Sequence, residues 1–144
     1  MTVNQILSSK GNEVYSIVST ITVYDAIKVM GEKNIGSVLV IEDSVLKGVL
    51  SERDYSRKVV LKDKSSKETL VSEIMETNVA TVKPTDDLEY CMELMTEKRV
   101  RHLPVVENDA VVGIISIGDV VISIIELQKD TIKHLDFYIS GSKA

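Results

Sequence analysis

The sequence predicts an α+β fold in which two copies of a β-α-β-β-α unit pack their sheets together. Three observations lead to this prediction. The chain repeats itself at a spacing of 65 positions, and each copy carries the same succession of apolar patterns. The composition, with 44% hydrophobic and 27% charged residues among 144, is that of a folded globular protein. A chain of this length can bury roughly 70% of its unfolded surface, which is enough for a real core.

The repeat appears when the sequence is shifted by 65 positions without gaps. The starts of the two copies align at an offset of 68 instead, because VNQIL (3–7) corresponds to VSEIM (71–75). The first copy therefore carries three extra residues, which we assign to the loop SSKGNE (8–13). Identical residues at the offset of 65 include Thr20/Thr85, Met30/Met95, Glu32/Glu97, Lys33/Lys98, Val40/Val105, Glu42/Glu107, Gly48/Gly113, Ser51/Ser116 and Asp54/Asp119.

The first half of each copy reads as a short helix, a short strand and a longer helix. The short helices are expected at about 3–8 and 70–75, and the strands at VYSIV (14–18) and VATV (79–82). Asp86-Asp87 favours the start of the second long helix through the helix dipole. The long helices follow from apolar residues at i, i+3, i+4 and i+7, namely Val23, Ala26, Ile27 and Met30, and Leu88, Cys91, Met92 and Met95.

The second half of each copy reads as a β-hairpin followed by a helix. Strands SVLVIE (37–42) and HLPVVE (102–107) lead into turns at Asp43-Ser44 and Asn108-Asp109. The next strand of each copy ends at a serine, and the last helix begins just after it. The segment KDKSSKETL (62–70) is polar and lacks apolar periodicity. The predicted domains are residues 1–62 and 70–128, with a linker at 63–69 and a helical tail at 129–144.

Charge, cysteine content and hydropathy exclude several partners. The net charge of −5 argues against nucleic acid, because phosphate contacts need a basic surface. The single cysteine, Cys91, lies on an apolar helix stripe, so we expect it to be buried and reduced. The N-terminal sequence lacks the pattern of a signal peptide. The apolar run 111–125 is shorter than a membrane span and contains Asp119. We expect a cytoplasmic protein with no membrane partner.

Catalytic chemistry has few candidate residues. The sequence contains no phosphate-loop, dinucleotide-binding or zinc-protease motif. Two histidines, His102 and His134, lie on different elements, and the one cysteine is expected in the core. We therefore predict no enzyme activity, no catalytic cofactor and no metal site.

The most distinctive feature is a corner that occurs twice, as GVLSERD (48–54) and GIISIGD (113–119). In one interpretation, the serine and the acid three residues later form a capping box at the start of a helix. In the other, the helix N-terminus offers N–H groups to an anion, and the carboxylate accepts hydrogen bonds from ribose hydroxyls. Gly48 and Gly113 serve the turn or permit close approach of neighbouring backbone. The residues alone leave both interpretations open.

The order of elements, the strands NIGSVLV (34–40) and HLPVV (102–106) and the two corners resemble a tandem pair of CBS domains, named after cystathionine β-synthase and also called a Bateman module. The resemblance covers nearly the whole chain except the segment 129–144. It implies two half-domains packed sheet to sheet with pseudo-two-fold symmetry, a cleft between them for an adenosine ligand, and homodimers formed through helices. The apolar helices at 22–33 and 120–127 fit such a dimer.

The resemblance also implies roles for individual residues. The carboxylates would hold ribose, with the second corner favoured, because the second copy is closer to the family pattern. Basic residues occur at opposite places in the two copies, and we expect them to converge on one phosphate across the cleft, since arginine binds phosphate in a bidentate manner. For each basic residue the simpler interpretation is a solvated charged face, with Asp54 and Lys58 paired at i, i+4. The expected contacts are Asp119 and Asp54 to ribose; Ser116, Ser51, Arg53, Arg57, Arg101 and His102 to phosphate or ribose; and Thr81, Leu103, Ser16, Ile17, Gly36 and Val38 to the base.

Two functions remain after these steps. The first is a stand-alone regulatory receptor that binds AMP, or ATP, NAD(H) or S-adenosylmethionine, and signals occupancy to an unidentified partner protein through differential affinity. The second is a structural dimerisation module, in which the two corners only cap helices.

Overall fold

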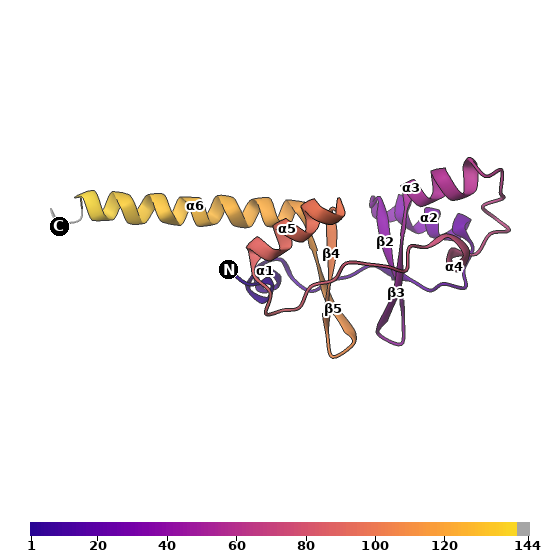
Figure 1. Cartoon of the computed structure of the whole chain (residues 1–144), viewed down its shortest axis with the longest axis horizontal. Helices are drawn as coiled ribbons and strands as arrows, with labels where there is room; N and C mark the ends of the chain where they lie inside the picture. The colour runs from indigo at the N-terminus through magenta and orange to yellow at the C-terminus, as the bar shows by residue number, and fades with distance from the viewer. Residues whose placement is uncertain (141–144) are drawn as a thin grey trace.

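The computed structural model describes residues 1–140 and has the predicted mixed α+β architecture. Figure 1 shows two β-hairpins side by side, with helices gathered at the ends opposite the hairpin turns and one long helix leaving the body. The helices are α1 (Val3–Lys10), α2 (Val23–Lys33), α3 (Glu52–Tyr55), the π-helical turn η1 (Ser56–Val60), α4 (Val71–Ile74), α5 (Leu88–Lys98) and α6 (Ile117–Ser140). The strands are β1 (Ser16–Ile17), β2 (Ser37–Glu42), β3 (Val45–Ser51), β4 (His102–Glu107) and β5 (Ala110–Ser116).

Both hairpins form as the turn residues predict. Strands β2 and β3 are antiparallel, as are β4 and β5, and each pair contains one irregularity in register at the equivalent place. The turn residues Asp43, Ser44, Asn108 and Asp109 all have positive φ, between 52° and 67°. Two successive residues of this kind give the turn whose twist matches a two-residue hairpin. The turns also join the sheets, since Val111 N–H donates to the Ser44 carbonyl at 3.0 Å.

The prediction of a strand at 79–82 is wrong, because this segment forms only a single β-bridge. Strand β1 pairs with β2 through two residues, whereas in the second repeat only Val82 pairs with Val105. Val82 donates to the Pro104 carbonyl at 3.0 Å and accepts from Val106 at 2.8 Å. A further pair in this parallel ladder would need an N–H from residue 104, and proline has none. The second sheet is therefore two-stranded.

The two short leading helices are exchanged between the repeats. Helix α1 packs into the core of the second repeat, where Val3, Ile6 and Leu7 are buried. Helix α4 packs into the core of the first repeat through Val71 and Ile74. Backbone hydrogen bonds hold both helices in place, since the Val3 N–H donates to the Asp86 carbonyl at 2.8 Å and the Val71 N–H donates to the Ile21 carbonyl at 3.0 Å. The boundaries 1–62 and 70–128 thus describe repeats in the sequence, and each core takes one helix from the other repeat.

Gly48 and Gly113 permit this exchange. A Cβ on Gly113 would lie 2.8 Å from a methyl group of Leu7 on α1, and a Cβ on Gly48 would lie 2.7 Å from the Glu76 carbonyl and 3.0 Å from the Met75 sulfur just after α4. Leu7 and Met75 occupy equivalent places at the offset of 68. Close approach of a neighbouring segment, one of the two roles expected for these glycines, is therefore what the structure shows.

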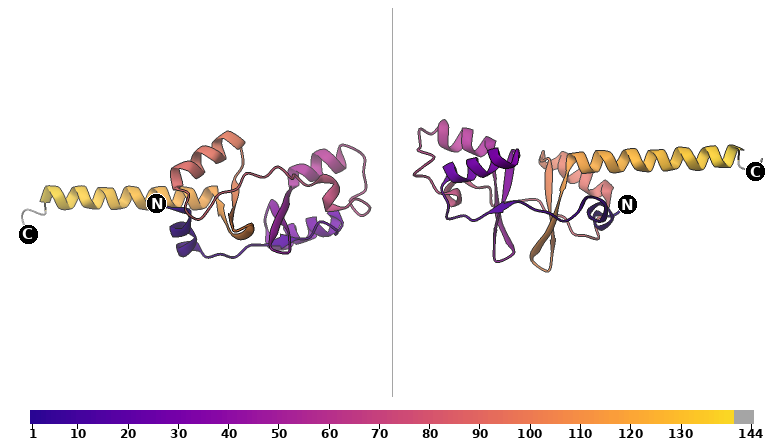
Figure 2. Two further views of the ribbon diagram at one scale, coloured as in Figure 1. Left: turned by 60° about the horizontal axis from the view of Figure 1, so that its bottom comes forward. Right: turned by 180° about the vertical axis from the view of Figure 1, so that it is seen from behind.

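The two cores consist almost entirely of aliphatic side chains, and Cys91 is fully buried in the second. No helix among residues 1–140 is long and apolar enough to span a membrane. The last predicted boundary falls inside a continuous helix, because α6 runs from Ile117 to Ser140. Figure 2 shows its second half projecting beyond the body from two further directions. Positions 141–144 of the predicted tail lie outside the described residues.

Candidate nucleotide-binding corners

Each corner lies where the last strand of a repeat becomes a helix. In the first, the Asp54 N–H donates to Ser51 Oγ at 3.1 Å, and the Ser51 N–H donates to Asp54 Oδ2 at 3.0 Å. In the second, the Asp119 N–H donates to Ser116 Oγ at 3.1 Å, and the Ser116 N–H donates to Asp119 Oδ2 at 2.8 Å. Both corners are reciprocal capping boxes, as the structural interpretation requires.

The backbone N–H of the first residue in each helix also has a hydrogen-bond acceptor within its own repeat. Glu52 N–H donates to the Gly36 carbonyl at 3.0 Å, and Ile117 N–H donates to the Arg101 carbonyl at 2.8 Å. Two of the first three N–H groups of each helix are thus engaged, since the third belongs to Asp54 or Asp119. An anion at either corner would meet one remaining backbone donor, so basic side chains must supply most of the charge.

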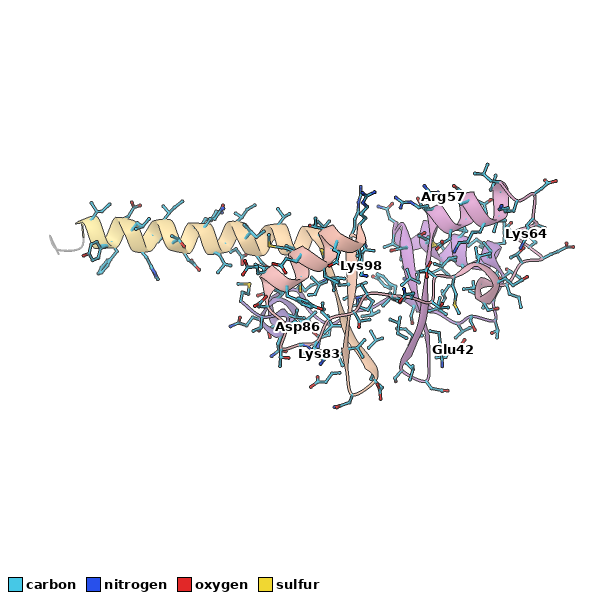
Figure 3. The ribbon with its side chains drawn as sticks, in the orientation of Figure 1. Glu42, Arg57, Lys64, Lys83, Asp86 and Lys98 are labelled. Carbon is cyan, nitrogen blue, oxygen red and sulfur yellow. The ribbon has the colours of Figure 1, made fainter. Side chains whose placement is uncertain are left out.

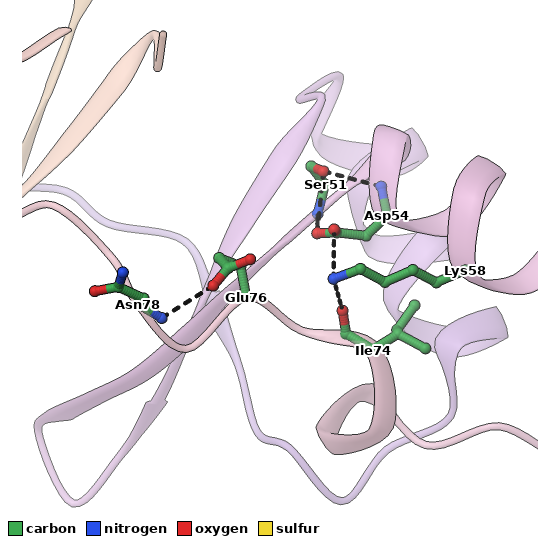
Figure 4. Close-up of polar contacts among 6 residues, drawn as sticks. All are labelled: Ser51, Asp54, Lys58, Ile74, Glu76 and Asn78. Carbon is green, nitrogen blue, oxygen red and sulfur yellow. Dashed lines mark hydrogen bonds and ion pairs between the residues drawn. The ribbon is translucent and has the colours of Figure 1, made fainter. Parts of the chain in front are cut away.

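A lysine holds each carboxylate, but the two lysines come from different places. Lys58, one turn beyond Asp54, lies 3.1 Å from Asp54 Oδ1 and donates to the Ile74 carbonyl at 2.9 Å (Figure 4). Lys10, at the end of α1, lies 2.6 Å from Asp119 Oδ2 and donates to the Ile114 carbonyl at 2.8 Å. The pair at i, i+4 was expected from the sequence. The contact of Lys10 was missed, because nothing local links positions 109 residues apart.

This difference leaves the two carboxylates unequal. Asp54 Oδ2 accepts from Ser51, and its Oδ1 faces Lys58. Asp119 Oδ2 accepts from both Ser116 and Lys10, and within residues 1–140 its Oδ1 has no hydrogen-bond partner. The second corner therefore presents one carboxylate oxygen that can accept a hydrogen bond from a ligand.

The surroundings of the second corner shift the pKa values of two side chains, Asp119 and His102. Burial alone would raise the pKa of Asp119, but hydrogen bonds from Lys10 and Ser116 outweigh burial and hold the pKa below its ordinary value. Neighbouring atoms exclude water from part of the His102 ring and lower its pKa, and the charge of Lys10 lowers it further, whereas Asp119 acts in the opposite direction. His102 lies opposite Ser116 on the β4–β5 ladder. The second corner thus combines an ionised carboxylate with a neutral imidazole at neutral pH.

The basic residues predicted to meet a phosphate come from both repeats. Arg53 and Arg57 lie on α3 and η1, and Arg101 directly precedes β4. Figure 3 shows Arg57 of the first repeat and Lys98 of the second on the side of the molecule away from the hairpin turns. The corners lie at the ends of β3 and β5, which are also opposite the turns. Among residues 1–140 the three arginines form no ion pair. Their guanidinium groups therefore lack a counter-ion within this part of the chain.

The residues predicted to contact the base divide into two groups. Ser16, Gly36 and Thr81 are exposed at the starts of strands or just before them. Ile17, Val38 and Leu103 are core residues, with side chains turned into the two hydrophobic clusters. In this conformation the aliphatic residues could offer a base only their backbone groups. Surface hollows lie on the faces of α6 and α5, and neither of these is lined by a corner residue.

Comparison with known proteins decides the family. The CBS domain family model matches residues 3–61 and 71–126, once for each repeat. The chain belongs to the CBS domain family. The CBS domain-containing protein CBSX3, mitochondrial, of Arabidopsis thaliana is 36% identical over 149 residues, which cover 97% of this chain and 72% of the relative. The CBS domain-containing protein YhcV of Bacillus subtilis is 33% identical over 102 residues, with 71% and 72% covered.

Solved CBS structures have the same fold. The CBS domain protein NE2398 superposes with a TM-score of 0.81 at 46% identity, with 87% of this chain and 98% of that chain covered. A Burkholderia ambifaria protein with CBS domains, described as acting in signal transduction, gives 0.80 at 48% identity, with 88% and 95% covered. The CBS domain protein PAE2072 of Pyrobaculum aerophilum, complexed with AMP, gives 0.72 at 24% identity, with 83% and 89% covered, and this likeness concerns the fold alone.

Proposed function

We propose that this chain is a regulatory CBS pair that binds an adenosine nucleotide, AMP in the first place, at the corner of Ser116 and Asp119. The observation that carries the proposal is the state of Asp119, which is ionised and has one oxygen without a partner among residues 1–140. An ionised carboxylate is a strong acceptor for hydroxyl groups such as those of a ribose. The AMP complex of a protein with this fold supports the same ligand class.

The phosphate of the nucleotide would be held by side chains more than by backbone. Arg53, Arg57 and Arg101 carry positive charge without ion pairs in the described chain, whereas the charge of Lys10 is balanced by Asp119. His102 would take up a proton as a phosphate approached, since a nearby negative charge raises the pKa of an imidazole. ATP and NAD(H) place their phosphates on the same side of the ribose and are the next candidates.

Regulation follows from differential affinity. A ligand between the repeats would stabilise one arrangement of the two sheets, and a partner protein that prefers this arrangement would respond. We place the signalling in a homodimer that pairs through helices, because Val121, Ile122 and Ile125 are exposed on the first half of α6. The expected cytoplasmic location stays a prediction.

Thermal melting with a panel of ligands tests the proposal. AMP, ADP, ATP, NAD, NADH and S-adenosylmethionine are each added to the wild type. AMP at 100 times its Kd should stabilise the fold by about 2.7 kcal/mol, which raises Tm by several degrees for a chain of this size. In Asp119→Asn the shift should vanish, while the free energy of unfolding without ligand should fall by no more than the Lys10 ion pair contributes, up to about 1 kcal/mol, because the asparagine oxygen can still accept from the Ser116 N–H.

Two further variants make the outcome specific. Asp54→Asn changes the corner whose carboxylate oxygens are both engaged, and should keep most of the AMP shift. Glu107→Gln, at the exposed end of β4, should behave as wild type. A wild type that no ligand stabilises, with Asp119→Asn melting well below it, would show that the corner only caps a helix.

The second candidate function is the structural dimerisation module. It is favoured by the complete capping boxes in both corners and by the lysine that already neutralises each carboxylate. Under this alternative the nucleotide panel gives no shift, while the chain still associates through its helices.

A further inference from the structure

Lys10 is the last residue of α1, the helix that the first repeat inserts into the core of the second. Its backbone has a rigid support, because Leu7, one turn earlier, is 4% exposed, and the Gly11 N–H donates to the Leu7 carbonyl at 2.8 Å. Gly11 ends the helix with a φ of 98°, a value that residues with side chains rarely adopt. The fold therefore fixes where the Lys10 side chain starts and places it beside the second corner.

The ammonium group of Lys10 has three N–H donors, of which the described chain uses two. One donates to the Ile114 carbonyl at 2.8 Å, and one donates to Asp119 Oδ2 at 2.6 Å. The third has no acceptor among residues 1–140. The side chains of Lys10 and Asp119 are 29% and 16% exposed, so solvent reaches both. At this corner an unused N–H donor and the unused oxygen Asp119 Oδ1 therefore belong to the same ion pair.

The first corner lacks this combination in the part of the chain that the structure describes. At the offset of 68 the counterpart of Lys10 is Asn78, which forms no hydrogen bond with Asp54 within residues 1–140 (Figure 4). The lysine on Asp54 is instead Lys58, which contacts Oδ1, while Oδ2 accepts from the N–H and the hydroxyl of the capping serine. Both oxygens of Asp54 are engaged, so an unused donor beside an unused acceptor distinguishes the second corner from the first.

A vicinal diol matches this arrangement, because each hydroxyl group both donates and accepts hydrogen bonds. One ribose hydroxyl can donate to Asp119 Oδ1, and the oxygen of the neighbouring hydroxyl can accept from Lys10 Nζ. Both are charge-assisted hydrogen bonds, which are stronger than those between neutral groups. A deoxyribose presents one hydroxyl here and leaves either the carboxylate oxygen or the ammonium N–H without a partner. Unpaired polar groups of this kind are the reason why a site built around a hydroxyl rejects an analogue that lacks it.

We propose that Lys10 is a ribose-binding residue that determines specificity for the sugar. It donates to one hydroxyl of the ribose, while Asp119 Oδ1 accepts from the other. The inference rests on the proposed function, to which it adds a requirement for an intact 2′,3′-diol. It also makes α1 a part of the ligand site, so the sugar is held by residues from both repeats.

Binding of deoxynucleotides tests the proposal on the full chain. Isothermal titration calorimetry measures the Kd of AMP, 2′-deoxy-AMP and 3′-deoxy-AMP for the wild type, for Lys10→Met and for the control Lys83→Met. The wild type should bind AMP at least about tenfold more tightly than either deoxynucleotide. In Lys10→Met one of these two Kd ratios should fall below about threefold while the other stays within about twofold of its wild-type value, because the variant loses the partner of one hydroxyl. Lys83→Met should keep both ratios.

Kd ratios separate the hydrogen bond from the charge of Lys10. All three ligands carry the same phosphate, so the loss of the charge changes their affinities alike and cancels in the ratios. The proposal would be overturned if a folded Lys10→Met, checked by urea unfolding, kept both ratios, lost both together, bound AMP more tightly or bound no ligand. In each of these cases AMP binding by the wild type would still support the proposed function. A wild type that binds none of the three ligands would overturn the proposed function as well.

Discussion

Asp54 and Asp119 show how the same local motif reaches two different states. Each carboxylate closes a capping box on its own serine, and each also faces a lysine. Lys58 comes from η1, one turn after Asp54, whereas Lys10 comes from α1 and is distant in the sequence. As a result, of these two carboxylates only that of Asp119 keeps an oxygen without a hydrogen-bond partner among residues 1–140.

Lys10→Met should make the stability of the protein less dependent on acid pH. The folded pKa of Asp119 is below its ordinary value of about 3.9. The ionised carboxylate therefore stabilises the folded state fully above the ordinary pKa, and this stabilisation is lost as the pH falls through the folded pKa. At pH 7 the variant should unfold with a free energy lower by up to about 1 kcal/mol, since the pair is partly exposed. Urea unfolding at pH 7, 5 and 3 measures this difference.

The difference between wild type and Lys10→Met should shrink at low pH. Protonation of Asp119 removes the attraction, and the charge that His102 gains below its lowered pKa repels Lys10. Lys83→Met, which changes an exposed lysine whose backbone N–H binds Asp86, is the matched control and should follow the wild type throughout. A gap between wild type and Lys10→Met that widens toward pH 3 would contradict this assignment.

At the scale of elements, the exchange of α1 and α4 is what joins the two repeats. The same pairing occurs at both ends, since Thr2 forms a bridge with Asp87 and Thr22 forms one with Leu70. Gly48 on β3 and Gly113 on β5 lack side chains that would collide with the exchanged segments. Separating the repeats would therefore expose both cores.

Gly48→Ala should destabilise the protein more than Gly113→Ala. A methyl group at position 48 meets the backbone carbonyl of Glu76, which is held by hydrogen bonds to Val49, whereas at position 113 it meets only the end of the Leu7 side chain. Overpacking costs about 1–3 kcal/mol, and a flexible side chain absorbs part of it. Urea unfolding of both variants and of Gly31→Ala, which has open space around it, measures the order. Equal costs for Gly48→Ala and Gly113→Ala would contradict the role of the rigid carbonyl.

Most elements could be predicted from the sequence because their signals are local. Apolar spacing gave the long helices, and pairs of turn residues gave both hairpins. The weak strand at 79–82 failed for a reason also present in the sequence, the missing N–H of Pro104. The exchange of α1 and the contact of Lys10 with Asp119 could not be predicted, because each depends on how distant segments pack.

At the scale of the whole molecule, duplication places two similar corners on one side of a pair of sheets. The hairpins lie side by side, so the strand ends opposite the turns bring residues of both repeats to the same region (Figure 3). Each repeat supplies different charges there, with Arg53 and Arg57 from the first and Arg101 and His102 from the second. Under the proposed function, a ligand that spans both repeats would act on their relative arrangement.

A crystal structure grown with millimolar AMP tests the central claim most directly. We expect density for the nucleotide at the second corner, with Asp119 Oδ1 within hydrogen-bond distance of a ribose hydroxyl and an arginine of the first repeat at the phosphate. A crevice that stays empty at both corners, with solvent between the arginines, would contradict it.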